Sequence, residues 1–203
     1  MVEFALKAGS PFAELLHPVG IGSGVTVSDR DGMGLASVMA LKGQRALVAE
    51  RLMTSYGFIA PKGPGRSAAG EVAIVGIGPD RWLATKSGAA NALAEDLARL
   101  LDGIAAVTDQ SDGYAVLRLQ GPALRQVLAK GVAIDLHPEA FPVNGAAVTA
   151  IAHIGVTLWR LDDAADGSPV FEIALFRSMA SSFMHWLESS AGEFGLDVAT
   201  PGN

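Results

Sequence analysis

Two segments in which an apolar run meets a Gly-Pro pair constrain the fold of this chain most strongly. The first is Ile77–Leu83 and the second is Leu117–Pro122. Each predicts the junction of a β-strand with a turn, because proline lacks the N–H that a central strand needs for pairing. Residues 89–101 lie between them and carry leucines and alanines on one side at helical spacing. This arrangement predicts an amphipathic helix that packs on a sheet.

The same order of elements occurs twice along the chain. Strand, helix, strand, strand, helix and strand follow one another at residues 25–110 and again at 111–203, after an extended arm at 1–24. This predicts an α+β fold of two ferredoxin-like βαββαβ lobes. No low-complexity linker separates the lobes, so we expect them to pack as one unit. The predicted helices are 43–56, 89–101, 122–130 and 180–194, and the predicted strands are 25–28, 35–41, 71–77, 82–85, 104–109, 114–119, 147–153, 156–161 and 170–176.

Composition narrows the class of protein. Of the 203 residues, 50% are hydrophobic and 18% are charged, and the charged share is below the roughly 25% of ordinary soluble domains. This indicates either a large core or a surface that a partner covers, since obligate interfaces are poor in charge. The chain has no cysteine, which excludes disulfides, thiolate metal sites and a cysteine nucleophile. Such a sequence fits the cytoplasm, where we expect the protein to act.

Charge and hydropathy argue against two kinds of partner. The formal net charge is −6 and no run of lysine or arginine occurs, so we expect no nucleic-acid binding. Residues 1–7 show no cationic leader before an apolar stretch. No apolar run approaches the ~18 residues that a membrane-spanning helix needs. We therefore expect neither a signal peptide nor a membrane partner.

Strong catalytic motifs are missing from the sequence. The four histidines are too far apart for a His-based metal motif, and neither a Gly-x-Ser-x-Gly elbow nor a Walker loop occurs. Gly20–Gly24 has the wrong spacing for a dinucleotide fingerprint. Gly63–Ala68 has a relaxed form of that spacing, but a strand rather than a helix follows it, which favours a mobile or partner-contacting loop. The sequence predicts no catalytic, cofactor-binding or metal-binding residue.

Acidic residues gather in two predicted turns. Asp109 and Asp112 form the first set, and Asp162, Asp163 and Asp166 form the second. Paired carboxylates can perform general acid–base chemistry. Aspartate in a turn, however, commonly accepts hydrogen bonds from its own backbone. The neighbouring Ser, Gly and Ala residues favour the turn interpretation for both sets.

The last predicted helix, 180–194, leaves two interpretations open. Its apolar residues span roughly 160°, which is wider than the ~100° stripe that a surface helix must bury. Met184 and Trp186 lie at the two edges of this arc. Either a broad core lies beneath the helix, or one of these side chains meets another subunit, where Met and Trp are enriched.

Several segments, taken in their order, resemble one protein family. This family is the gamma subunit of heterotetrameric sarcosine oxidase, which is related to the folate-binding aminomethyltransferase superfamily. The resemblance covers most of the chain and is strongest from about residue 72 onward. The segments that carry it are Gly78–Leu83, Val107–Gly113, Leu117–Pro122, Ile134–Pro142, Leu158–Arg160, Phe171–Ile173 and Phe176–Ser178.

The resemblance implies a function as well as a fold. The fold would be that of the folate-binding aminomethyltransferase domain. The chain would be a noncatalytic subunit of a cytoplasmic flavoenzyme that converts sarcosine to glycine with oxygen and produces hydrogen peroxide. The one-carbon unit would pass to tetrahydrofolate or leave as formaldehyde. The partners would be the alpha, beta and delta subunits, which would hold FAD, FMN, NAD and tetrahydrofolate, with no cofactor in this chain.

Two other functions stay open. A stand-alone folate-binding or aminomethyltransferase-like protein would need a pocket between the lobes lined by a carboxylate, for which Asp109 is the candidate. A homo-oligomeric binding module is the third possibility, and it would form a self-sufficient dimer.

Overall fold

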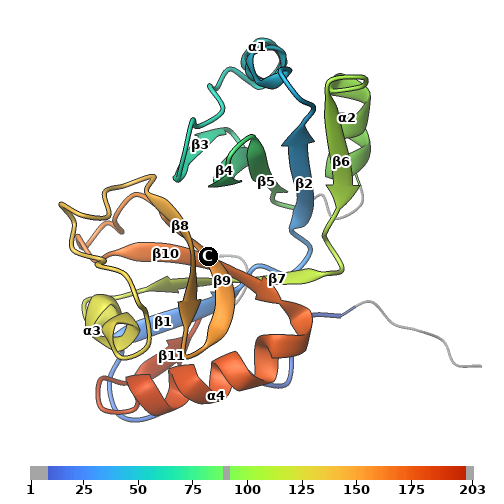
Figure 1. Cartoon of the computed structure of the whole chain (residues 1–203). Coiled ribbons are helices and arrows are strands. Elements are labelled where there is room, and N and C mark those ends of the chain that lie inside the picture. Colours follow the sequence, from blue (N-terminus) through green and yellow to red (C-terminus); the bar gives the residue numbers. More distant parts are fainter. Residues whose placement is uncertain (1–8, 89–91, 200–203) are drawn as a thin grey trace, which may run out of the picture.

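Two β-sheets, each packed against helices, form the protein (Figure 1). The computed structural model describes residues 9–88 and 92–199. The first eight residues of the predicted arm and the predicted helix start at residue 89 lie outside the described residues. The first sheet has the strand order β3 (Gly65–Ala69), β4 (Val72–Gly78), β5 (Arg81–Lys86), β2 (Gly34–Ala40) and β6 (Ala105–Asp109).

The second sheet is larger and contains both early and late parts of the chain. Its strand order is β11 (Leu196–Val198), β1 (Val25–Asp29), β7 (Tyr114–Gln120), β10 (Val170–Phe176), β9 (Ile154–Arg160) and β8 (Ala146–Ile151). The helices are α1 (Arg45–Tyr56), α2 (Leu93–Leu100), α3 (Leu124–Ala129) and α4 (Ala180–Ala191), with a short 3₁₀ turn, η1 (Arg177–Met179), before α4.

Both sheets repeat one topology, which confirms the predicted α+β fold with two lobes. In the first lobe, β4, β5, β2 and β6 are neighbours in that order, with α1 and α2 as connections. This is the antiparallel order of a βαββαβ unit. In the second lobe, β9, β10, β7 and β11 follow the same order, with α3 and α4 as connections and β1 inserted between β7 and β11. Each lobe also adds one edge strand, β3 or β8.

Strand β1 belongs to the second sheet, although the sequence suggested that it opens the first lobe. It pairs antiparallel with β7 and parallel with β11. Val25 and Val27 are fully buried in the core between this sheet and helices α3 and α4. The alternating apolar residues of β1 therefore belong to the core of the second lobe. The proposed domain boundary at residue 110 stays a prediction.

Residues 9–24 pack on the second lobe and do not extend away from the protein as an arm would. Phe12 is fully buried, and Leu15, Leu16 and Val19 cover the same core. Val19 and Leu196 exchange two backbone hydrogen bonds of 2.9 and 2.8 Å. The spacing of these apolar residues in an otherwise irregular segment explains why it is held against the core.

The glycines of this segment allow two stretches of backbone to touch. A Cβ atom at Gly195 would lie 2.1 Å from the Gly22 carbonyl oxygen, and one at Gly24 would lie 2.5 Å from the Phe194 oxygen. Gly24 N donates to Phe194 O at 3.0 Å, and Val25 N donates to Gly195 O at 3.0 Å. The glycines that lack a dinucleotide spacing thus have a packing role.

Three apolar clusters hold the layers together. The largest lies between the second sheet and α3 and α4, and another lies between the first sheet and α1 and α2. A smaller third cluster joins the two sheets, so the lobes pack on each other as predicted. Its buried members are Met33, Leu35, Val75, Leu83, Val116, Ala146, Trp159 and Ala174.

Helix α4 favours the broad-core interpretation. Met184 is buried within the largest cluster, so it cannot contact another subunit. Trp186 is half-buried, with its ring centroid 5.6 Å from that of Phe183. A Cβ atom at Gly131 would lie 2.7 Å from the indole, so the ring already covers the chain's own backbone. Across residues 9–88 and 92–199, no helix has the length and hydropathy that would let it cross a membrane.

Replacing Gly195 should show how much the close backbone contact between Gly195 and Gly22 contributes to the free energy of unfolding. Gly195 has φ +81° and Gly167 has φ +80°, but only Gly195 has another backbone within reach of an added methyl group. A left-handed backbone costs an alanine roughly 1–2 kcal/mol. Gly167→Ala should lose about that amount, and Gly195→Ala should lose clearly more free energy of unfolding. Urea denaturation followed by tryptophan fluorescence checks this, and equal losses would show that the contact is unimportant.

Candidate functional site

A buried carboxylate with several cationic neighbours lies on the face of the second sheet that turns toward the first. Glu172, in the middle of β10, is only 4% exposed. Its cross-strand neighbours are Arg118 on β7 and Trp159 on β9. Arg118 donates to Glu172 Oε1 from Nη2 at 2.8 Å and from Nε at 3.1 Å, and Trp159 Nε1 donates to Oε2 at 2.9 Å. Strand register therefore brings the three side chains together.

Arg30 completes this site from the segment that leaves β1. Its Nε lies 3.2 Å from Glu172 Oε1, and its Nη2 donates to the Ser87 hydroxyl at 2.9 Å. Ser87 follows β5, so Arg30 connects the two lobes. We call Arg30, Arg66, Arg118 and Glu172 the arginine cluster.

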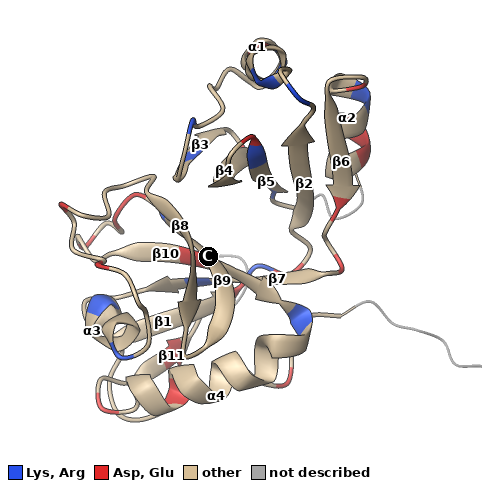
Figure 2. Ribbon diagram, viewed as in Figure 1, with Lys and Arg blue, Asp and Glu red and all other residues tan. Residues whose placement is uncertain are grey.

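The arginine cluster carries more positive than negative charge. Burial and repulsion from Arg118 lower the pKa of the Arg30 guanidinium, and Glu172 opposes this only in part. Burial also lowers the pKa of Arg66 on β3, whose Nε is buried without an acceptor among the described residues. Arg30 and Arg118 thus pair with one buried carboxylate, whose charge also acts on Arg66, and Arg66 donates to Asn144 Oδ1 at 3.1 Å. Figure 2 shows the charged bands on β3 and β10.

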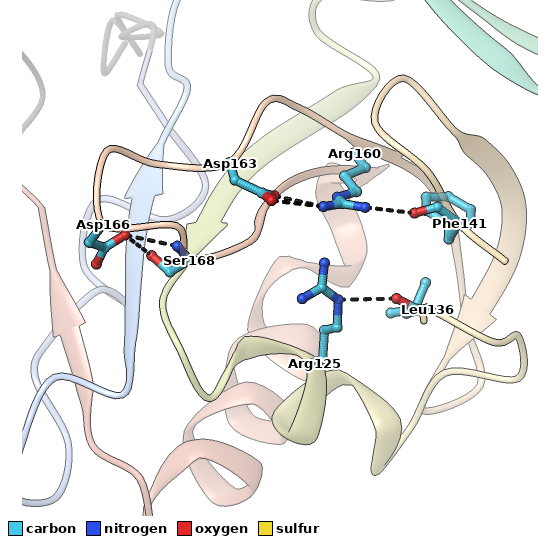
Figure 3. A network of polar contacts seen from close by, with 7 residues as sticks. All are labelled: Arg125, Leu136, Phe141, Arg160, Asp163, Asp166 and Ser168. Atoms are coloured by element: carbon cyan, nitrogen blue, oxygen red, sulfur yellow. Dashed lines mark hydrogen bonds and ion pairs between the residues drawn. The ribbon is translucent and has the colours of Figure 1, made fainter. Parts of the chain in front are cut away.

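A second polar network fixes the loops at the other side of the second sheet (Figure 3). The buried Arg160 donates to Phe141 O at 3.1 Å and to both carboxylate oxygens of Asp163 at 2.8 and 3.0 Å. Arg125 Nε donates to Leu136 O at 3.1 Å. These hydrogen bonds hold the segment before β8 to Arg125 of α3 and Arg160 of β9, and they hold the segment after β9 to Arg160.

The acidic residues of the predicted turns do not form one site. The Asp109 carboxylate accepts hydrogen bonds from Ser111 N at 2.9 Å and from the Ser111 hydroxyl at 2.7 Å. Asp163 pairs with Arg160, whereas Asp166 accepts from the Ser168 hydroxyl and backbone, which lower its pKa. This pattern fits the turn interpretation. Asp112 and Asp162 are exposed near these groups.

The remaining sequence candidates are also dispersed. His17 lies 3.6 Å from Glu188, and His137, His153 and His185 are exposed on separate elements. Among the residues that the structure describes, no group of three or more His, Cys, Asp or Glu side chains is arranged to hold a metal ion. The prediction that this chain has no catalytic, cofactor-binding or metal residue stays a prediction.

The loop expected at residues 57–70 is partly wrong, because its end forms strand β3. Residues 65–69 pair antiparallel with β4. Gly76 on β4 packs so closely on this segment that a Cβ atom there would lie 2.1 Å from the Gly63 oxygen. The glycines therefore serve strand packing here too.

Two shallow grooves meet at Ile77 on β4. One has a volume of about 380 Å³ and is lined by Arg45, Lys62, the glycine-proline turns and Val148 of β8. The other has a volume of about 360 Å³ and lies on the first sheet. Both grooves have mainly small, apolar or basic linings. Neither includes Asp109, the carboxylate that a pterin pocket was expected to use.

Sequence reasoning missed Glu172 and its arginines, although a signal was present. Glu172 and Arg118 each stand alone inside an otherwise apolar strand. Central strands that pack on both faces must pair any charge that they bury. Two opposite charges in two such strands therefore indicate a pair, although not its position in the fold.

Comparison with known proteins gives the family. The model of the sarcosine oxidase gamma subunit family matches residues 44–193. A sarcosine oxidase subunit gamma of Corynebacterium sp. strain U-96 is 32% identical over 170 residues, covering 80% of this chain and 75% of that protein. The corresponding protein of Corynebacterium sp. strain P-1 is 38% identical over 125 residues, covering 62% of this chain and 59% of that protein.

Solved structures agree in fold. A chain of the heterotetrameric sarcosine oxidase from Corynebacterium sp. U-96, in complex with pyrrole 2-carboxylate, superposes with a TM-score of 0.75. It is 29% identical, and the match covers 92% of this chain and 96% of that chain. The glycine cleavage system aminomethyltransferase T of Bartonella henselae gives a TM-score of 0.62 at 18% identity, covering 88% of this chain and 48% of that chain.

The two lobes thus define a protein of the aminomethyltransferase-like fold class. The match covers about half of the Bartonella henselae aminomethyltransferase chain. Within this class, the chain belongs to the sarcosine oxidase gamma subunit family. The resemblance inferred from the segments between residues 78 and 178 is confirmed.

Removing the central carboxylate should destabilise the junction of the lobes. Glu172→Ala leaves Arg30 and Arg118 facing each other and removes the acceptor of Trp159 Nε1. We expect a loss of about 2–4 kcal/mol in the free energy of unfolding, less than for fully buried pairs because both arginines reach solvent. Urea denaturation measures it, with Glu71→Ala as the exposed control. Equal stability of the two variants would contradict this role of Glu172.

Proposed function

We propose that this chain is a noncatalytic gamma subunit that supports the assembly of a heterotetrameric sarcosine oxidase. The single observation that carries the proposal is shared length: the match covers 92% of this chain and 96% of a chain in a heterotetrameric sarcosine oxidase. The two therefore have nearly the same extent as well as the same fold. A chain of this kind is expected to act through the surfaces that it offers to other subunits.

The proposed complex demethylates sarcosine to glycine and produces hydrogen peroxide. It transfers the one-carbon unit to tetrahydrofolate or releases it as formaldehyde. Its alpha, beta and delta subunits are the proposed partners of this chain in the cytoplasm, and they hold FAD, FMN, NAD and tetrahydrofolate. The low share of charged residues supports a partner-covered surface.

The commitment of charged groups to internal contacts supports a noncatalytic role. Glu172 neutralises arginines, Asp163 holds Arg160, and Asp109 accepts hydrogen bonds from its own turn. A general base must instead be free to reach a substrate proton. These three carboxylates are thus used for structure.

Affinity purification from the native host tests the assembly. The tagged chain should recover larger subunits in fixed stoichiometry, and the eluate should show flavin absorbance. Mass spectrometry identifies the recovered chains, and an untagged strain gives the background. Recovery of a single colourless species would contradict the proposal.

A stand-alone folate-binding protein is the second candidate function. One observation favours it: the arginine cluster places excess positive charge at the lobe junction, and folate carries carboxylates. The position of Asp109, bound to Ser111 outside the grooves, argues against the pterin contact expected of it.

Titration of tetrahydrofolate into the isolated chain separates the two candidates. We expect no saturable binding in calorimetry at micromolar ligand, because the proposed folate site is in a partner subunit. Asp109→Ala and Asp112→Ala serve as matched variants from the same turn. Tight binding by the wild type and Asp112→Ala, lost only in Asp109→Ala, would make folate binding the function of this chain.

A further inference from the structure

One face of the first sheet is only partly covered by the rest of the chain. Its opposite face packs on α1 and α2, where Val38 and Trp82 are buried. On the face toward the second sheet, Leu35, Val75 and Leu83 are buried in the cluster that joins the lobes. Farther along the same strands the cover decreases: Ser37 and Ile77 are half-buried, and Met39 and Arg81 are exposed.

Strand register shows where the cover ends. Met39 on β2 pairs with Arg81 on β5 at one side and with Ala106 on β6 at the other. Met39 is 43% exposed, and Arg81 and Ala106 are exposed as well. Ser37 and Thr108 form the neighbouring pair and line the same 360 Å³ groove. We call the whole set the open strip, and it consists of Ser37, Met39, Ile77, Arg81, Ala106 and Thr108.

The open strip has the chemistry of a docking surface. Met39 and Ile77 offer apolar area, and the small residues Ser37 and Ala106 allow another backbone to come close. On this inner side, Met39 of β2 and Ala106 and Thr108 of β6 are exposed among the described residues.

Positive charge adjoins the open strip. Arg81 lies within it, and the second groove, which also contains Ile77, adds Arg45 and the exposed Lys62. Asp80 Oδ1 lies 3.4 Å from Arg45 Nη1 and neutralises part of the Arg45 charge. The whole chain nevertheless has a net charge of −6. A locally basic surface on an acidic chain favours an acidic occupant.

We propose that the open strip is the docking site for a larger chain of the oxidase assembly, which presents an apolar segment flanked by carboxylates. This inference rests on the proposed function, because the occupant is one of the proposed partner subunits. The apolar segment covers Met39 and Ile77, and the carboxylates face Arg81 and Lys62.

The test uses two exposed methionines of similar exposure. Met39→Glu places a carboxylate in the proposed interface, and Met53→Glu places one on α1, where Met53 is 47% exposed. Each tagged full-length variant is purified from the native host. Flavin absorbance per mole of tagged chain reports the recovered partners, and mass spectrometry identifies them. We expect at least a tenfold fall for Met39→Glu and no change for Met53→Glu.

Two further variants protect the test against misfolding and examine the charge. Ala106→Glu, on the neighbouring strand, should repeat the effect of Met39→Glu, and thermal unfolding verifies that each variant folds. Arg81→Glu should weaken recovery more than Arg81→Ala, since only the former repels an acidic partner.

The outcomes separate this inference from the proposed function. If the wild type recovers flavoprotein subunits and all variants do so equally, the docking site is wrong while the function stands. If the wild type recovers none, the proposed function fails first. A dimer of the isolated chain that Met39→Glu dissociates would identify a second copy as the occupant and would overturn the inference.

Discussion

The junction of the lobes depends on the contacts that Arg30, Arg118 and Trp159 make with the buried carboxylate of Glu172. This carboxylate accepts from Trp159 on one neighbouring strand and from Arg118 on the other, and it attracts Arg30 from the segment after β1. Because Arg30 also bonds to Ser87 of the first lobe, a single buried charge ties both lobes to three strands of the second sheet. The apolar cluster beside it is small, so this polar contact gives the junction its specificity.

Local patterns predicted most elements because each lobe is built from hairpins and helices that follow each other along the chain. Strands β4 and β7 do end at the two Gly-Pro pairs, and a helix is present in each of the four predicted regions. The segments that carry the family resemblance also prove structural. Trp82 donates to Pro61 O, Arg160 holds Phe141 O, and Arg177 bonds to Gly9 O.

What the sequence could not provide was pairing between distant parts. Strand β11 has three residues and β3 is rich in small residues, so neither has a clear apolar alternation. The position of β1 depends on pairing with β7 and β11, and Phe12 is buried in a cluster that includes residues of α3 and α4, all far away in sequence. The arginine cluster brings together β3, β7, β10 and the segment after β1, and the open strip lies where the second sheet stops covering the first. None of these is visible in a local window.

The insertion of β1 between β7 and β11 has a consequence for how the protein is made. The first lobe, β2 to β6, is a closed insertion between two neighbouring strands of the second sheet, and all its pairings are internal. It can therefore form while the chain is still being synthesised. The second sheet, in contrast, joins Val25 to Leu196. Strand β1 therefore cannot pair with β11 until the ribosome has synthesised nearly the whole chain. Such long-range closure is slow, and the exposed edge of β1 during that wait is where a newly made chain is most open to aggregation.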